Sequence, residues 1–534
     1  MQFATDRSYA RIKTLSSLFL IGCLLLYVIG TWHWPLVGDA ALMHYVVFLM
    51  DHGMALYRDI VDPNLPTTFL IQGAVVHLFG GGPLPWRLFD IFLLLVSGIA
   101  MWVICRPYGW FAGTFAATLY ALIHGRDGVI QLGQRDLTMT AFLLIGYAFL
   151  FEGLRATPSG KTMLWMIFMF GASCGIAATI KPSVLLLPPT LLTMAALALK
   201  RKGRPFLSHV TCGTIGMLVP ITLVFAYIFH RHVLRAFWGT LLDLVPYFGL
   251  LDTRSFGHLV LHSISSVMLP LVLIWIPIAV SLREKWLTWE RAALFVGVLF
   301  GLASFYVQRK GYPYHRYPSE AFMLLLIGID FSTVLSETAH DRRPYLHRLA
   351  LAGIFVGVIV IGGGSTVHAL RQDGRNREFT SMLEADLKPL GGNKLTGHIQ
   401  CLDMADSCIT ALYDMKLVQA TGFLYDCYMF STAEHAERER YREAFWQAIM
   451  KNPPIVFVVS SHDCQVYPEL PSYNYKKIGR WPLFSDYLKA NYYLDVERIP
   501  PHMVNWGSSP SKPLGYRIYM RNSSSSEHSK LLIR

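Results

Sequence analysis

Long apolar segments recur along most of this chain, and they restrict its fold more than any other feature. A segment of about 20 apolar residues is long enough to cross a bilayer as an α-helix. Only 15% of the residues are charged, whereas soluble domains have about 25%. We therefore predict an α-helical polytopic membrane protein with about eleven transmembrane helices. The apolar segments lie near 15–35, 86–104, 108–124, 136–152, 163–180, 183–199, 209–229, 262–282, 290–307, 317–335 and 349–367.

The basic residues between these segments predict an orientation. Cytoplasmic loops carry the excess of Lys and Arg, and an odd number of spans places the two ends of the chain on opposite sides. We predict an integral inner-membrane protein with a cytoplasmic N-terminus and a periplasmic C-terminal domain. The net charge of +12 comes from scattered loops and not from a basic domain with interleaved aromatic residues, so nucleic acid is not an expected partner. Sixteen Lys and Arg residues lie near the N-terminus and at 106, 155–161, 200–204, 283–291 and 342–348.

The chain divides into two predicted domains. Residues 1–367 form a transmembrane domain with a large first periplasmic loop at 36–85. Within that loop, 41–51 and 66–79 are apolar with polar interruptions, which is typical of helices lying along a membrane surface. Residues 368–534 form a small periplasmic α/β domain, because short apolar or alternating runs predict strands and one segment has a helical period. The predicted strands lie at 394–403, 454–461 and 515–522, and the helix at 440–451.

The eight cysteines follow the same division. Four lie in or beside apolar segments, where a free thiol packs as a small hydrophobe. The other four lie in the C-terminal domain, and an oxidising compartment would allow them to form two disulfides in any of three pairings. A zinc site is the competing interpretation, although no CxxC spacing is present. The disulfide candidates are Cys401, Cys408, Cys427 and Cys464.

Acidic residues gather in the first loop, beside the membrane. Asp39 follows the first apolar segment, and Asp59 and Asp62 lie in a proline-stiffened turn. Ionisable groups at a membrane edge are costly and are usually retained for a function. Asp39 could accept a proton from an acceptor hydroxyl or hold a divalent ion that does so. The simpler interpretation of each acid is a helix cap or an Asx turn.

Cations lie in other loops on the predicted outer side. Arg135 and Asp136 begin an apolar segment, and Lys181 lies in a short turn before Pro182. An ion pair, a cap, or a lysine that reaches the membrane surface would also explain these residues. The segment at 308–318, QRKGYPYHRYP, is unusually basic for this side. Arg and Lys bind phosphate oxygens, so we predict a donor phosphate site. Its candidates are Arg126, Arg135, Lys181, Arg309, Lys310, His315 and Arg316.

The motifs together resemble the GT-C superfamily of membrane glycosyltransferases, in the branch of the protein O-mannosyltransferases and lipid A aminoarabinose transferases. The resemblance rests on Gly38-Asp39, residues 57–66, Arg135-Asp136 and Lys181-Pro182. It implies a polyprenyl-phosphate-linked sugar as donor and Asp39 as the general base of an inverting transfer. Asp59, Asp62 or Asp136 would then position the acceptor or a metal. Many relatives have a second acid where this chain has Ala40, so the role of a divalent cation stays open.

Two other functions compete with glycosyl transfer to a glycan, lipid or protein acceptor. A transporter or flippase for lipid-linked sugars would share the spans and the cations, but such proteins often contain repeated halves, and no repeat is evident here. An O-antigen polymerase or ligase would use the same donor chemistry and place its basic residues in a late outer loop, as at 308–318. We predict the glycosyltransferase, because acids and cations on one face suit both an acceptor hydroxyl and a phosphate leaving group.

Overall fold

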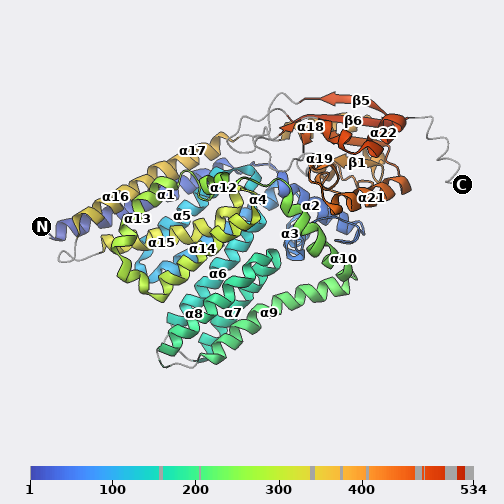
Figure 1. Cartoon of the computed structure of the whole chain (residues 1–534). Coiled ribbons are helices and arrows are strands. Elements are labelled where there is room, and N and C mark those ends of the chain that lie inside the picture. The colour runs from blue at the N-terminus through green and yellow to red at the C-terminus, as the bar shows by residue number, and fades with distance from the viewer. Residues whose placement is uncertain are drawn as a thin grey trace.

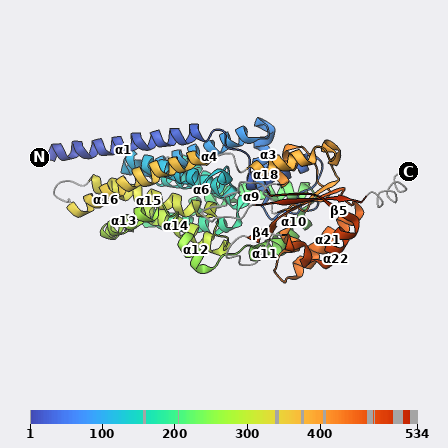
Figure 2. The same cartoon turned by 90° about the horizontal axis from the view of Figure 1, so that it is seen from above.

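A helical bundle and a smaller mixed domain make up the chain, and the mixed domain lies at one end of the bundle (Figure 1). The N-terminus begins at the opposite end, as the view from above also shows (Figure 2). The computed structural model describes residues 2–155, 160–201, 203, 206–336, 343–372, 377–403, 408–463, 472–473, 475–499 and 514–522.

All eleven predicted apolar segments contain a helix, which confirms the predicted fold class. Nine helices of the described chain are long and apolar enough to cross a membrane. Of the other two, α13 has 13 residues and α5 ends in the polar sequence His124–Asp127. The helices are α1 (Gln2–Gly30), α4 (Pro83–Cys105), α5 (Trp110–Asp127), α6 (Arg135–Arg155), α7 (Gly160–Ile180), α8 (Leu187–Arg201), α9 (Leu207–His230), α13 (Leu269–Ser281), α14 (Trp289–Gln308) and α15 (Tyr317–Leu335). The last crossing is α16 (Pro344–Val356), which continues through the π-helical turn Gly357–Gly363 into α17 (Gly364–Arg371).

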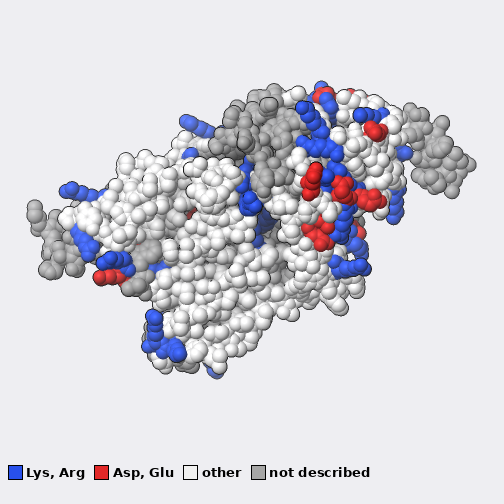
Figure 3. Space-filling model, in the orientation of Figure 1, with Lys and Arg blue, Asp and Glu red and all other residues white. Residues whose placement is uncertain are grey.

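The surface of the bundle has the charge distribution expected of a membrane protein. Figure 3 shows a face with few charged side chains over the middle of the bundle, with Lys and Arg at the end far from the mixed domain. The C-terminal end of α8 and the start of α9 lie at that far end, together with the start of α1 (Figure 1). Charged residues of both signs cover the visible face of the mixed domain (Figure 3). An apolar belt between two polar ends fits a bilayer around the bundle.

Short helices lie at the end of the bundle that carries the mixed domain. The first loop contains α2 (Gly38–Asp51) and α3 (Pro66–Phe79), which confirms the two helices predicted there. The connection between α9 and α13 contains α10 (Leu234–Gly239), α11 (Val245–Leu250) and α12 (Phe256–His262), which were not predicted. Their short length gives little periodic signal, because a helical pattern needs a window of about 11 residues or more.

The C-terminal domain is a mixed sheet covered by helices, as predicted. The described strands pair in the order β1-β2-β6-β5, with β1 parallel to β2 and the other pairs antiparallel. The predicted strands correspond to β1 (Ile399–Leu402), β2 (Val456–Ser460) and β6 (Tyr516–Arg521), and the predicted helix to α21 (Ala436–Lys451). The edge strand β5 (Tyr492–Arg498) and the helices α18 (Glu378–Leu387), α19 (Cys408–Asp414), α20 (Cys427–Phe430) and α22 (Pro482–Asn491) complete the domain, with a separate short pair, β3 (His462–Asp463) and β4 (Ser472–Tyr473).

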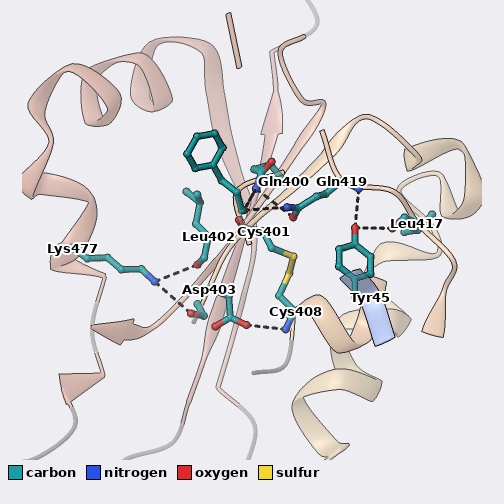
Figure 4. Close-up of a disulfide and its surroundings, with 11 residues drawn as sticks. Tyr45, Gln400, Cys401, Leu402, Asp403, Cys408, Leu417, Gln419 and Lys477 are labelled. Atoms are coloured by element: carbon teal, nitrogen blue, oxygen red, sulfur yellow. Dashed lines mark hydrogen bonds between the residues drawn. A yellow bond between two sulfur atoms is a disulfide. The ribbon is translucent and has the colours of Figure 1, made fainter. Parts of the chain in front are cut away.

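Cysteines of the C-terminal domain form disulfides, while the four near the membrane segments are free. Cys401 on β1 is bonded to Cys408 on α19, as Figure 4 shows. Cys427 is also in a disulfide, and Cys464 lies outside the described residues. Disulfides persist in oxidising compartments, so these bonds agree with the predicted periplasmic location.

The first loop is hydrogen-bonded to the C-terminal domain. Tyr45 on α2 donates to the carbonyl of Leu417 (3.0 Å) and accepts from the backbone N–H of Gln419 (2.9 Å), as Figure 4 shows. The N–H of Val61 donates to the carbonyl of Gly422 (3.0 Å). At Gly422 a Cβ atom would lie 1.6 Å from the carbonyl oxygen of Asp59, so only glycine allows this contact. The C-terminal domain therefore fixes the loop that carries the predicted acids.

Candidate functional site

Asp39 lines a pocket at the domain-bearing end of the bundle. It is the second residue of α2, and its side chain is partly exposed. The pocket also contains Gln72 from α3, Trp86 from α4 and Arg135 from α6. The pocket has a volume of about 410 Å³, counted to its open mouth.

Two cations lie beside this carboxylate. Arg135 is the first residue of α6 and interacts electrostatically with both Asp39 and Asp62. Lys181, in the turn after α7, forms an ion pair with Asp136 (Nζ–Oδ1 2.6 Å) and also interacts with Asp39. Burial lowers the pKa of Lys181 to about 8, and the charge of Arg135 contributes to this shift. Burial and the charge of Arg135 thus disfavour the protonated form of Lys181. Perturbed groups of this kind are common at functional sites, and here an anionic ligand would stabilise the positive charge.

The turn before α15 forms another wall of the cluster. The Tyr314 hydroxyl lies near the Asp39 carboxylate and Arg135 and interacts with both. The neighbouring His315 is buried and interacts electrostatically with Lys181 and Arg135. A base, two cations and a phenol hydroxyl thus come from four separate parts of the sequence.

Asp62 is the buried acid of the cluster. Its Oδ1 accepts the backbone N–H of Asn64 (2.8 Å), which makes the predicted Asx turn. Burial raises the pKa of Asp62 to about 6, despite the opposing effects of Asn64 and Arg135. Burial of a carboxylate costs free energy unless a partner compensates it, so the acid is expensive to retain for a turn alone.

Several polar atoms of the cluster are buried without a hydrogen bond in the described part of the chain, although Arg135 Nε and Asp136 Oδ2 lie 3.8 Å apart as an ion pair. Buried polar groups are nearly always hydrogen-bonded in native proteins, and an exception calls for a ligand, a water or an ion. The atoms are Asp62 Oδ2, Asp136 Oδ2, Arg135 Nε and His315 Nδ1. They give the site donors for phosphate oxygens and acceptors for hydroxyls.

The structure does not bring the remaining candidates into this pocket. The Asp59 carboxylate accepts from Arg58 (2.8 Å) and from the N–H of Ala55 (2.8 Å) on the outside of the loop. Arg316 pairs with Asp127 (3.1 Å) and Glu320 (3.4 Å), so its guanidinium links α5 to α15. Arg126 lies at the end of α5, where its charge faces His368.

Lys310 and Arg309 do not line the pocket. Lys310 is buried and donates to the carbonyls of Phe248 (2.8 Å) and Leu251, which end α11. Its pKa falls to about 8, chiefly through burial. Arg309 is exposed, in a left-handed backbone conformation after α14. Of the cations predicted in 308–318, only His315 has its side chain within the cluster around Asp39.

The donor set around Asp39 does not define a metal site. No group of three or more His, Cys, Asp or Glu side chains in the described ranges is close enough to hold a metal ion. Asp39 and Asp62 are close enough to interact, but Arg135 lies near both of them. A cation already compensates the acids where a divalent ion would have to bind, so we derive no step through a metal.

Two residues near Asp39 were not predicted from the sequence. Trp86 is buried at the start of α4 and lines the pocket. Tyr314 belongs to the cationic segment at 308–318, but its position beside Asp39 was not predicted. An aromatic residue at the first turn of an apolar segment is usual in membrane proteins, so the sequence carried no signal that separates Trp86 from an interfacial anchor.

Comparison with solved structures shows the fold. The chain is similar to ArnT from Cupriavidus metallidurans bound to undecaprenyl phosphate, with a TM-score of 0.58, 15% identity, and 94% of this chain and 97% of that chain covered. It is also similar to the oligosaccharyltransferase AglB from Archaeoglobus fulgidus in complex with an inhibitory peptide and a dolichol-phosphate, with a TM-score of 0.53, 11% identity, and 95% and 74% covered. Both have the GT-C fold that the sequence predicted. No family model and no curated protein matches the sequence.

Proposed function

We propose that this chain of GT-C fold is an inverting glycosyltransferase that moves a sugar from a polyprenyl-phosphate donor to an acceptor hydroxyl. Asp39 accepts the acceptor proton, and the hydroxyl oxygen attacks the anomeric carbon. The bond from that carbon to the phosphate oxygen breaks, and polyprenyl phosphate leaves with the electron pair. The acceptor is a glycan, a lipid such as lipid A, or a protein of the cell envelope.

One observation carries this proposal: a partly exposed carboxylate lines a pocket together with Arg135, and Lys181 and the Tyr314 phenol lie near enough to interact with it. A base in hydrogen-bonding reach of the acceptor typically contributes 10²–10⁴-fold to the rate. Arg135 and Lys181 would stabilise the charge that develops on the departing phosphate, which is the main electrostatic task of such a transfer. The unpartnered Arg135 Nε provides a donor for that phosphate.

Two similar structures support the choice of donor. ArnT is bound to undecaprenyl phosphate and AglB to a dolichol-phosphate. Both ligands are polyprenyl phosphates, and both proteins share the fold of nearly the whole chain. We extend this donor class to the present chain, with an active site on the periplasmic face of the inner membrane, a cytoplasmic N-terminus, and the domain division at 367/368. The role of the C-terminal domain is to hold the first loop over the pocket.

The test is release of polyprenyl phosphate from purified protein in detergent. Each member of a panel of radiolabelled polyprenyl-phosphate sugars is mixed with acceptors of the three classes, and free polyprenyl phosphate is measured. Release by the wild type that is lost in Asp39→Asn supports the transferase. The matched control is Asp51→Asn at the other end of α2, where the acid is paired with His77 on the surface (3.0 Å), and its activity should equal that of the wild type.

Two outcomes would overturn the proposal. Equal release by Asp39→Asn and wild type would remove Asp39 as the base. Tight binding of a donor with no release in the presence of any acceptor would favour a transporter of lipid-linked sugars instead.

A further inference from the structure

The turn at 128–134 determines where Arg135 lies. It contains the short 3₁₀ helix Val129–Gln131 and leads directly into Arg135, the first residue of α6. Gly128 and Gly133 both have positive φ, at 98° and 58°. Such a turn has little secondary structure to hold it, so its position depends on side chains from other elements.

A buried ionic group in the bundle binds this turn. The Asp90 carboxylate on α4 accepts the backbone N–H of Gly133 at Oδ1 (2.8 Å), two residues before Arg135. The same oxygen lies 2.9 Å from His124 Nε2, and Oδ2 accepts from Arg87 Nη1 (2.5 Å). All three charged or titratable side chains are 0% exposed.

The indole of Trp86 holds the same turn from the same helix. Its Nε1–H donates to the carbonyl of Leu132 (3.0 Å). A Cβ atom on Gly133 would lie 2.5 Å from the indole ring. Any larger residue at this position would clash with Trp86, so the ring packs directly against the backbone of the turn. Two neighbouring residues of the turn are therefore fixed by one turn of α4.

His124 connects this group to the turn before α15. Because a carboxylate only accepts hydrogen bonds, His124 Nε2 donates to Asp90. The Nδ1 atom lies 2.8 Å from the hydroxyl of Tyr317, three residues after Tyr314. One carboxylate thus links the turn that carries Arg135 to the turn that carries Tyr314.

Helix packing alone does not require such a group. Replacing a buried ion pair by apolar residues is often neutral or stabilising, and charged side chains inside a membrane bundle are costly and usually functional. Arg87 is also bound by the Thr31 hydroxyl (2.6 Å), the Tyr27 hydroxyl (3.2 Å) and the Tyr27 and Trp34 rings, although its Nε has no hydrogen-bond partner in the described part of the chain. These contacts hold its guanidinium against Asp90, beside the turn.

We infer that Asp90, Arg87 and His124 form a positioning clamp that keeps Arg135 and Tyr314 at a fixed separation for the donor phosphate. None of the three lines the pocket, so the clamp acts through the residues that do. The inference rests on the proposed function. Misplacement of a binding group by about 1 Å can cost up to about a hundredfold in rate, which is the scale on which such a clamp would matter.

The experiment compares two buried aspartates at opposite ends of the bundle. In Asp90→Asn the amide cannot accept from Arg87, His124 and Gly133 together, because one of its two positions is itself a donor. Asp330 is the matched control: it is also 0% exposed and accepts from Arg291 (3.2 Å) and Trp275 (3.0 Å). It lies near the end of α15, far along the bundle from the pocket.

Three measurements are made on each full-length variant in detergent: the affinity for undecaprenyl phosphate, the melting temperature, and hydrogen–deuterium exchange of the amides at 129–138. Asp90→Asn and Asp330→Asn should both lower the melting temperature. Only Asp90→Asn should weaken undecaprenyl phosphate binding, by about tenfold, and accelerate exchange at 129–138. Trp86→Phe keeps the ring but removes the bond to Leu132. Trp86→Phe should weaken binding and accelerate exchange at 129–138 by about a third as much as Asp90→Asn. This variant replaces Asp90→Asn in the test if Asp90→Asn does not fold.

The outcomes separate the two proposals. Equal affinity and equal exchange in Asp90→Asn, Trp86→Phe and the control would overturn the clamp and leave the transferase intact. Absence of undecaprenyl phosphate binding by the wild type would overturn the proposed donor and, with it, the role of the clamp.

Discussion

Arg155 and Arg135 lie at the two ends of the same helix, and their surroundings differ completely. Their side chains are similarly exposed, at 15% and 19%. Arg155 donates to Glu290 (2.9 and 3.0 Å), Glu152 (3.2 Å) and the carbonyls of Val103 and Ile104, at the end of α4. The nearest ion-pair contact of Arg135 is its neighbour Asp136 at 3.8 Å, and its Nε has no hydrogen-bond partner in the described part of the chain.

The difference distinguishes an arginine that holds helices together from one that is available to a ligand. A guanidinium has five N–H donors, and Arg155 uses its donors on protein groups. Arg135 is held in place by its backbone, through the turn at 128–134, and not by its own side chain. Unused donors beside a carboxylate base are what a phosphate leaving group needs.

The largest effect is expected from replacing the proposed base, Asp39, which lies beside Arg135. Asp39→Asn should lower the transfer rate by at least a hundredfold, because general base catalysis contributes about 10²–10⁴-fold. The substitution retains the size of the side chain, so the affinity for the donor should change little. Single-turnover rates and equilibrium binding of the labelled donor measure the two quantities separately. A parallel loss of affinity would mean that Asp39 binds the donor instead of activating the acceptor.

The second prediction replaces each of the two arginines by glutamine, in separate variants. Arg135→Gln should weaken donor binding by about tenfold or more, since a hydrogen bond to a charged group contributes about 1.5–3 kcal/mol, and should change the melting temperature little. Arg155→Gln should do the reverse, because it removes the ion pair with Glu290. Equilibrium binding and thermal unfolding of both variants decide the matter. The same pattern in the two variants would contradict the distinction between them.

A third prediction concerns pH. The Lys181 ammonium, with its pKa of about 8, is lost as the pH rises through that value. The donor phosphate is a diester with a single acidic oxygen, so its one negative charge does not change over this pH range. Donor affinity should therefore fall several-fold between pH 7 and pH 9, and Lys181→Arg should abolish the fall because guanidinium stays charged. Binding isotherms across this range provide the measurement, and an equal decline in Lys181→Arg would assign it to another group.

The smallest expected effect compares two acids of the first loop. Burial raises the pKa of Asp62, so its ionised form opposes folding above about pH 6. Asp62→Asn should raise the melting temperature by a few degrees at pH 7.5, with the gain disappearing toward pH 4, and should lower activity. The hydrogen bond from Arg58 holds the pKa of Asp59 below its usual value, so Asp59→Asn should slightly destabilise the protein. Thermal unfolding at several pH values tests both, and stabilisation by Asp59→Asn would reverse the assignment.

Some of the residues proposed for the site lie close together, and the sequence explains why. Asp39, Asp62, Asp136, Arg135, Lys181 and His315 were named from the sequence and lie together in the structure. They follow or precede apolar segments on the same predicted side, so topology alone brings them to one end of the bundle. Lys310 and Arg316 also lie on that side, but their partners are backbone carbonyls and acids of other helices. Loop position therefore selects an end of the protein and not a pocket.

The proposed clamp of Asp90, Arg87 and His124 could not be predicted from the sequence. Arg87 and Asp90 fall within a segment predicted to be a membrane helix, where a charged pair three residues apart suggests only a local ion pair. Their importance depends on Gly133 and His124, from two other parts of the chain. Similarly, α11 was not predicted, and its contacts come from residues far away in the chain: Lys310 donates to the carbonyl of Phe248, and Tyr247 donates to that of Tyr428.

The sequence by itself determined the apolar segments, their alternating direction, the mixed C-terminal domain and the end of the bundle where acids and cations gather. These features depend on hydropathy, periodicity and charge, which are local properties of a segment. Only the tertiary structure decided which cations face Asp39, which are used to join helices, and which buried group holds the turn before α6. The number of free donors on a charged side chain depends on the atoms packed around it, and these come from residues far apart in the chain.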